Sequence, residues 1–338
     1  MYAVRHMNKL NGTSGVAWNL VADIGGTNAR LGIEEYATSR LQLVEQYTVS
    51  QHENFSDILS AFLAGIASAQ TWKPQPEGAC FAVACAVDSD CLQLTNSSWT
   101  IDRAEISAML GGISVELIND FAAVGYAITD LNPEDWHEVG RGQPVTGRPI
   151  AILGPGTGLG VCSLLPVGAG YSVIEGEGGH VDFAPGSSQE ILILKALQAE
   201  FGRVSVERLL SGSGLLNIYR ALARSVNDTP RFHTPEAVSQ AAQAHQDGLA
   251  VEALSTFFAV LGSVAGNLAL TLGAKGGVYI AGGIAPQLIE FAVASEFRER
   301  FEAKGRFRSY LENIPLRVVI KKNLGLVGSV KKLSLSQF

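Results

Sequence analysis

The stretch VADIGGTNARLGI, residues 21–33, reads as a strand that is broken by two glycines and then resumed. Asp23 precedes the break, and Thr27 follows Gly25 and Gly26. A Gly-Gly pair between apolar runs favours a β-hairpin. The same turn can present backbone N–H groups and a hydroxyl to an anion, because glycine lets the backbone approach closely and adopt positive φ.

A second stretch, AILGPGTGLGVCSLL (residues 151–165), repeats this design around Gly156, Thr157 and Gly158. One such turn alone is better explained as an ordinary hairpin. Two matched turns predict two related halves, with one hairpin from each half closing on the phosphates of a nucleotide. Asp23 beside such a turn would repel phosphate, so the pattern predicts Mg²⁺ held by one carboxylate, waters and phosphate oxygens rather than by a set of protein ligands.

Two other phosphate-binding motifs are excluded. A P-loop requires a Gly-Lys pair, and the sequence contains none. A dinucleotide fingerprint opens a helix, whereas both glycine turns here lead into apolar segments that are typical of strands.

Composition limits the class of protein. The chain has 338 residues, is 47% hydrophobic and carries a formal charge of -7. This length favours two domains, and the charge argues against a nucleic-acid or membrane-surface binder. The longest apolar run, residues 259–272, is short and contains Asn267, so we expect a soluble protein. Residues 1–18 have no apolar core typical of a signal peptide.

Strand and helix patterns alternate along the chain, which predicts an α/β architecture with helix-covered sheets. Strands are predicted at 17–24, 29–34, 41–48, 79–87, 115–118, 149–154, 159–166, 171–174, 277–281 and 316–320. Helices are predicted at 54–69, 103–110, 120–128, 187–201, 205–210, 213–225, 234–244, 247–273, 285–293 and 295–303.

Candidate residues for a second substrate lie between and after the two turns. Asn119 and Asp120 open a helical pattern, where Asp120 taken alone is better explained as a helix cap. Glu177 and His180 flank a Gly-Gly turn, a poor metal site but a suitable one for a polyhydroxylated ligand. Glu207 taken alone is better explained as a surface carboxylate on a helix.

Six segments, in this order, together resemble the bacterial glucokinase family, of the sugar kinase and actin-like ATPase superfamily. They are DIGGTNARL (23–31), INDF (118–121), GPGTGLG (154–160), GEGGHVDFAP (176–185), SVERLLSGSGL (205–215) and GGVYIAGGIAP (276–286). Related repressor-type kinases carry a cysteine-rich zinc motif after the Gly-His element. Residues 178–190 contain no cysteine, which favours the branch without zinc.

The resemblance implies a two-domain actin-like ATPase (ribonuclease H-like) fold, with mixed central sheets and an interdomain cleft. Residues 1–18 would be an extension, 19–128 with 318–338 a small α/β domain, and 129–317 a large one. The family usually has Asn-Pro-Gly-Leu near its end, where this chain has Asn-Leu-Gly-Leu at 323–326.

The resemblance also implies roles for individual residues. Asp120 would be the catalytic base on the sugar 6-hydroxyl, and Asn119, Glu177, His180 and Glu207 would bind the other hydroxyls. Asp23 would act near Mg²⁺. The residues implied to contact or flank the nucleotide are Gly25, Gly26, Thr27, Gly156, Thr157, Gly158, Ser211, Gly212, Gly214, Gly282 and Gly283.

The predicted activity is phosphoryl transfer from Mg-ATP to glucose, giving glucose 6-phosphate and ADP. A kinase for another hexose, or one that uses polyphosphate, is the alternative within the same class. A non-catalytic sugar sensor or repressor is the alternative outside it, although residues 1–18 are too short for a helix-turn-helix domain. We expect a cytoplasmic homodimer that binds neither nucleic acid nor membrane.

Overall fold

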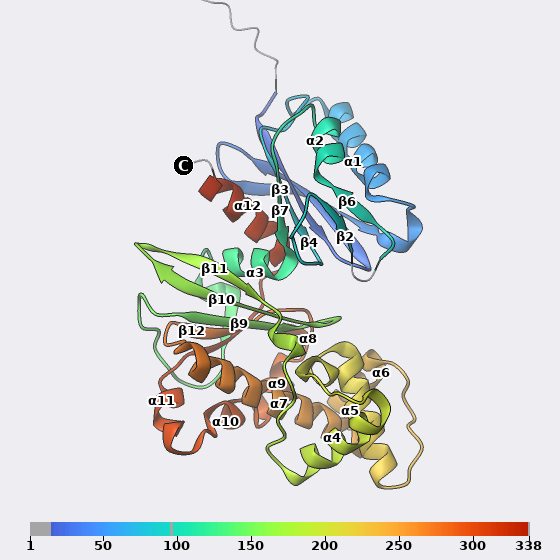
Figure 1. Ribbon diagram of the computed structural model, residues 1–338, viewed down its shortest axis with the longest axis vertical. Coiled ribbons are helices and arrows are strands. Elements are labelled where there is room, and N and C mark those ends of the chain that lie inside the picture. The colour runs from blue at the N-terminus through green and yellow to red at the C-terminus, as the bar shows by residue number, and fades with distance from the viewer. Residues whose placement is uncertain (1–14, 95–96, 337–338) are drawn as a thin grey trace, which may run out of the picture. The chain divides into compact units, whose positions relative to one another are not determined.

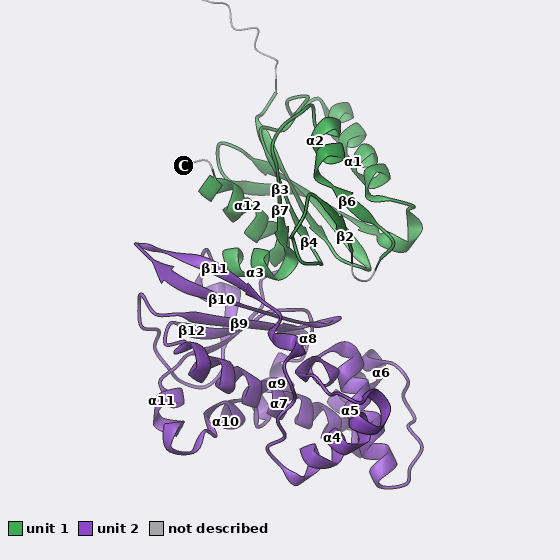
Figure 2. Cartoon of the chain, in the orientation of Figure 1, with its two compact units in different colours: residues 1–127, 323–338 green, residues 128–322 purple. Residues whose placement is uncertain are grey.

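The computed structural model describes residues 15–94 and 97–336, so most of the expected 1–18 extension lies outside the described residues. The chain forms two compact units (Figure 2). Unit 1 comprises residues 1–127 and 323–338, and unit 2 comprises residues 128–322. The last segment of the chain therefore belongs to the same unit as the first.

A mixed sheet forms the centre of unit 1, with strand order β3-β2-β1-β4-β7. Its strands are β1 (Trp18–Ile24), β2 (Asn28–Glu35), β3 (Arg40–Thr48), β4 (Ala79–Val83) and β7 (Val115–Asn119). β1 and β2 form the predicted antiparallel hairpin, in which Ile24 pairs with Ala29 across the glycine turn. β4 and β7 run parallel to β1.

Helices cover both faces of this sheet (Figure 1). On one face, α1 (Phe55–Ala69) and α2 (Arg103–Met109) contribute to a core that contains Trp18, Phe81 and Trp99. α1 buries residues spaced at three and four positions, as predicted, and the Asn54 side chain caps its first turn. On the other face, α3 (Asp120–Ile128) and α12 (Leu324–Ser336) pack on the sheet through a smaller apolar cluster.

The sheet of unit 2 repeats this design, with strand order β11-β10-β9-β12-β13-β8. Its strands are β8 (Trp136–Glu138), β9 (Ile150–Pro155), β10 (Leu159–Val167), β11 (Gly170–Gly176), β12 (Gly277–Ile280) and β13 (Leu316–Val319). β9, β10 and β11 form an antiparallel meander, and β12 and β13 run parallel to β9. The two related halves predicted from the glycine turns are thereby confirmed.

A helical layer packs on the sheet of unit 2, and its longest helix is α7 (Gly248–Leu272). Its other principal helices are α4 (Ser188–Phe201), α5 (Gly212–Ser225), α6 (Pro235–Gln243) and α10 (Phe297–Glu302). Among the described residues, α7 is the one helix long and apolar enough to span a bilayer, and 61% of its most apolar segment is buried. α5, α6 and α10 pack against it, which makes α7 a core helix of this unit.

The structure corrects some predicted elements. The helix expected at 205–210 is a single 3₁₀ turn, η4 (Val206–Arg208), and the helix expected at 285–293 is divided into α8 (Ile284–Gln287) and α9 (Ile289–Ala294). Sequence analysis also missed short strands and one short α-helix. These are β5 (Cys91–Gln93), β6 (Thr100–Asp102), β8 and α11 (Arg308–Glu312), which are too short to show a periodic pattern.

Candidate functional site

In unit 1 the predicted residues gather at the carboxyl ends of parallel strands. Ile24 of β1 pairs with Val83 of β4, which in turn pairs with Asn119 of β7. The first glycine turn therefore follows β1 at the same sheet edge at which Asp120 follows β7. This edge is where open α/β sheets bind their ligands.

Asn119, rather than Asp120, caps helix α3. Its Oδ1 accepts hydrogen bonds from the backbone N–H groups of Phe121 (2.9 Å) and Ala122 (3.0 Å), and its Nδ2 donates to the carbonyl of Cys85. The capping role considered for Asp120 is therefore wrong. Asp120 is half-buried in the first turn of α3, on a backbone that Asn119 fixes.

Asp23 lies beside the side chain of Arg30 and beside the start of helix α12. Arg30 Nη1 lies 3.3 Å from Asp23 Oδ2. Burial raises the pKa of the Asp23 carboxyl, while Arg30 acts in the opposite direction. A Cβ on Gly325, near the start of α12, would lie 2.6 Å from Asp23 Cγ, so a side chain there would have to displace this carboxylate. The positive end of α12 thus lies close to this carboxylate.

The second glycine turn, in unit 2, is closed by a hydrogen bond of 2.8 Å from the Gly156 N–H to the Gly158 carbonyl. Positive φ, which was one reason given for these glycines, does not occur at Gly25, Gly156 or Gly158. Close approach is the remaining reason. A Cβ on Gly156 would meet nothing within 4 Å, whereas one on Gly158 would lie 2.6 Å from Glu207 Oε2.

A cavity of about 620 Å³ opens beside this turn, within unit 2. It is lined by Gly156, Thr157, Gly212, Ser213, Leu215, Pro235, Glu236, Ser239, Gln240, Gln243, Gly283, Ile284, Gln287 and Leu288. Its volume is in the range of small-molecule sites, and its lining combines apolar side chains with a few polar groups. The structure thus brings four of the predicted nucleotide-contacting residues to one cavity.

Four other predicted nucleotide residues of unit 2, which are Gly158, Ser211, Gly214 and Gly282, are not among the residues that line the cavity. Ser211 is 1% exposed, and its Oγ accepts from the Gly214 N–H as the cap of α5. Gly214 packs against the backbone of Leu209, and Gly282, with φ of +84°, packs against the carbonyl of Pro155. Gly158 packs against Glu207, as described above.

Sequence analysis missed the wall of the cavity that α6 supplies. Glu236, Ser239, Gln240 and Gln243 repeat at the helical spacing of three and four residues. The sequence shows this polar stripe on α6. Such a stripe usually indicates a solvent-exposed helix face, so it did not predict the wall of a cavity.

The three predicted sugar ligands of unit 2 surround the start of β10. Glu177 precedes the 3₁₀ turn η3 (Gly178–His180) and His180 is its last residue, and both side chains are exposed. A Cβ on Gly179 would lie 2.2 Å from the Leu159 carbonyl, so this turn lies directly on β10. Glu207 is half-buried on η4, not on a helical surface as its sequence context suggested, and its Oε2 accepts from the Leu159 N–H at 2.8 Å.

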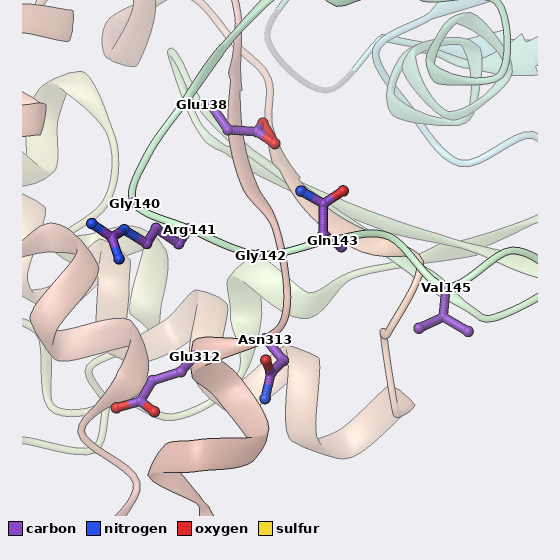
Figure 3. Close-up of a pocket in the computed structure, with 8 residues that line it drawn as sticks. All are labelled: Glu138, Gly140, Arg141, Gly142, Gln143, Val145, Glu312 and Asn313. Atoms are coloured by element: carbon purple, nitrogen blue, oxygen red, sulfur yellow. The ribbon is translucent and has the colours of Figure 1, made fainter.

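Another cavity of unit 2, of about 550 Å³, contains none of the predicted site residues (Figure 3). Its lining comes from the segment around Arg141 and from Glu312 and Asn313. Glu138, which also lines this cavity, forms an ion pair with Arg317, in which Glu138 Oε2 lies 2.9 Å from Arg317 Nε. The cavity beside the Gly156–Gly158 turn, by contrast, is lined by predicted nucleotide residues, which makes it the candidate nucleotide site of unit 2.

Comparison with known proteins identifies the family. The family model described as Glucokinase matches residues 20–335. The chain belongs to the glucokinase family. The glucokinase of Shigella sonnei (strain Ss046) is 43% identical over 310 residues, which cover 92% of this chain and 95% of that protein. The family predicted from the six segments is thus confirmed, and its relatives agree with the predicted ATP-dependent glucose kinase activity.

Solved structures of glucokinases share the fold. A glucokinase from an Antarctic psychrotroph has a TM-score of 0.83 at 31% identity, covering 94% of this chain and 99% of that one. A ROK family glucokinase from Streptomyces griseus, solved with glucose and AMPPNP, has a TM-score of 0.64 at 16% identity, covering 94% of this chain and 99% of that one. The predicted α/β actin-like ATPase fold with mixed sheets is confirmed.

A stability prediction concerns the cap of α5 in this glucokinase-family chain. Ser211→Ala should lower the free energy of unfolding by about 1 to 2 kcal/mol, because it removes the cap of α5 and the bond that Ser211 Oγ donates to the Glu207 carbonyl. Urea denaturation measures the change. Ser188→Ala, at an exposed position in α4, is the control and should change stability by less than about 0.5 kcal/mol. Equal effects of the two substitutions would contradict the capping role.

Proposed function

We propose that this protein transfers the terminal phosphoryl group of Mg-ATP to the 6-hydroxyl of glucose, giving glucose 6-phosphate and ADP. The observation that carries the proposal is the cavity of unit 2, which gathers a glycine turn, the start of α5 and Gly283. Glucokinase relatives such as that of Shigella sonnei, 43% identical over 310 residues, support the same reaction.

For the nucleotide, we propose that Thr157 contacts phosphates through its hydroxyl and its backbone N–H. The N–H groups of Gly156 and Gly212 are already bonded to the carbonyls of Gly158 and Gly156, so these two glycines would instead let the phosphates approach the backbone closely. The first residues of α5 add the positive end of a helix, which favours an anion. Leu215, Ile284 and the polar stripe of α6 supply the mixed apolar and polar surface that suits a base and ribose.

Magnesium would be held mainly by phosphate oxygens and waters, with Asp23 close to it. The described residues contain no group of three or more His, Cys, Asp or Glu side chains that could hold a metal ion by themselves. A single half-buried carboxylate suits Mg²⁺, which usually keeps several waters. The ion would neutralise charge on the phosphate oxygens.

For the sugar, we propose that Asp120 accepts the proton of the 6-hydroxyl. Phosphoryl transfer requires little covalent work from the protein, so one carboxylate placed at the acceptor alcohol is sufficient. Asn119 retains one amide proton for a sugar hydroxyl, since Nδ2 carries two and one is donated to Cys85. Glu177, His180 and Glu207 would bind the remaining hydroxyls.

The thiol near Asp120 does not compete for this role. Burial, and then the neighbouring carboxylates of Asp120 and Asp88, raise the pKa of the Cys85 thiol. The thiol therefore stays protonated and poorly nucleophilic at neutral pH. Among the described residues, Cys80, Cys85, Cys91 and Cys162 form no disulfide bond, which suits the reducing cytoplasm that we propose as the location. We also propose a homodimer, which size-exclusion chromatography with light scattering would test.

The activity is tested by a coupled assay across ATP, ADP and polyphosphate with glucose, mannose and fructose. We expect kcat/KM to be highest for ATP with glucose and the reaction to stop when EDTA removes Mg²⁺. A preference for polyphosphate or for another hexose would overturn the assignment of substrates. Sugar binding without product from any donor would favour a sensor.

A further inference from the structure

Glu207 lies beside the predicted sugar ligands, and it also forms a hydrogen bond at the end of the Gly156–Gly158 turn. Its Oε2 accepts a hydrogen bond of 2.8 Å from the backbone N–H of Leu159. Leu159 is the first residue of β10 and directly follows the Gly156–Gly158 turn. A carboxylate thus fixes the chain at the point where the turn ends.

The glycine at position 158 is explained by the same carboxylate. A Cβ there would lie 2.6 Å from Glu207 Oε2, well inside contact distance, and Gly158 does not have a positive φ. A side chain at this position would have to displace the Glu207 carboxylate, so glycine lets that carboxylate lie against the turn.

The segment that carries Glu207 also holds the other end of the turn. Ser211 Oγ donates to the Glu207 carbonyl at 2.9 Å, and the next N–H, that of Gly212, donates to the Gly156 carbonyl at 2.9 Å. Residues 207–212 thus contact the turn on both sides of Thr157, a residue that lines the cavity.

We propose that Glu207 is a positioning residue that holds the Gly156–Gly158 turn in the shape that binds nucleotide phosphate, in addition to any contact with sugar. This inference rests on the proposed function, because it assumes that the cavity of unit 2 binds ATP. The hydrogen bond, not the negative charge, carries the effect, since a carboxylate near phosphate by itself disfavours binding.

The test is the affinity for AMPPNP with Mg²⁺, measured by titration calorimetry without sugar. Glu207→Ala should raise Kd about tenfold or more, because a hydrogen bond to a charged acceptor is lost. Glu207→Gln retains an oxygen acceptor for the Leu159 N–H and removes the charge, so its Kd should stay at or below that of the parent protein. Glu175→Ala is the matched control, because Glu175 is an exposed glutamate of β11 in the same unit and does not line the cavity.

Each outcome decides the question. If Glu207→Ala binds AMPPNP as tightly as the parent protein, or if Glu207→Gln loses as much affinity as Glu207→Ala, the positioning role is wrong. If the parent protein does not bind AMPPNP at all, the proposed function fails instead. Should Glu207→Ala not fold, Gly158→Ala displaces the carboxylate from the turn side, and unchanged AMPPNP affinity in that variant would equally overturn the inference.

Discussion

Asp120→Asn should lower kcat by about 10²- to 10⁴-fold while glucose binding remains measurable. Asparagine has nearly the same shape as aspartate but cannot accept the proton of the 6-hydroxyl. The backbone should stay in place, because Asn119 Oδ1 supplies the cap of α3. Steady-state kinetics with ATP and glucose give kcat, and calorimetry gives the glucose Kd.

Asp57→Asn is the matched control for this change. Asp57 is also an aspartate in the first turn of a helix of unit 1, but it is exposed on α1. We expect its kcat to equal that of the parent protein. Near-native turnover of Asp120→Asn would show that another group takes the proton, and loss of glucose binding would indicate that Asp120 acts mainly as a sugar ligand.

The parts of the fold that sequence predicted are those specified by local chemistry. Both hairpins were predicted because glycine-rich turns separate apolar runs, and the strands on either side of each turn do pair antiparallel. Helix starts such as that of α4, where the Ser187 side chain accepts from the Glu190 N–H, were readable from the capping residue and the apolar spacing that follows it. The repeated topology followed from the two turns.

The parts that sequence could not predict depend on contacts between distant segments. Glu207 lies in a run that resembles a helix, yet its carboxylate turns to the Leu159 N–H, 48 positions away along the chain. The wall of the cavity formed by α6 has the same local pattern as a solvent-exposed face. Local propensity carries no information about which polar face meets another segment.

Gly328 of α12 makes such a contact between distant segments, because it packs against α3. Its substitution should have a large effect on the stability of unit 1. A Cβ on Gly328 of α12 would lie 1.7 Å from the carbonyl oxygen of Ala123 in α3. Both positions are buried, so Gly328→Ala must separate the two helices or shift the sheet beneath them. We expect the free energy of unfolding of unit 1 to fall by about 3 kcal/mol or more, the upper end for overpacking. Urea denaturation followed by tryptophan fluorescence measures this, since Trp18 and Trp99 lie in the core of unit 1.

Gly65→Ala is the control, since it makes the same chemical change within α1 at an exposed position where a Cβ meets nothing within 4 Å. It should raise stability by about 0.5 to 1 kcal/mol, because alanine favours the helix. Gly328→Ala should also lower kcat, because Ala123 lies one helical turn from Asp120 and a displaced α3 moves the base. A Gly328→Ala protein as stable and as active as the parent would show that α3 and α12 can separate freely, and that the position of Asp120 does not depend on their packing.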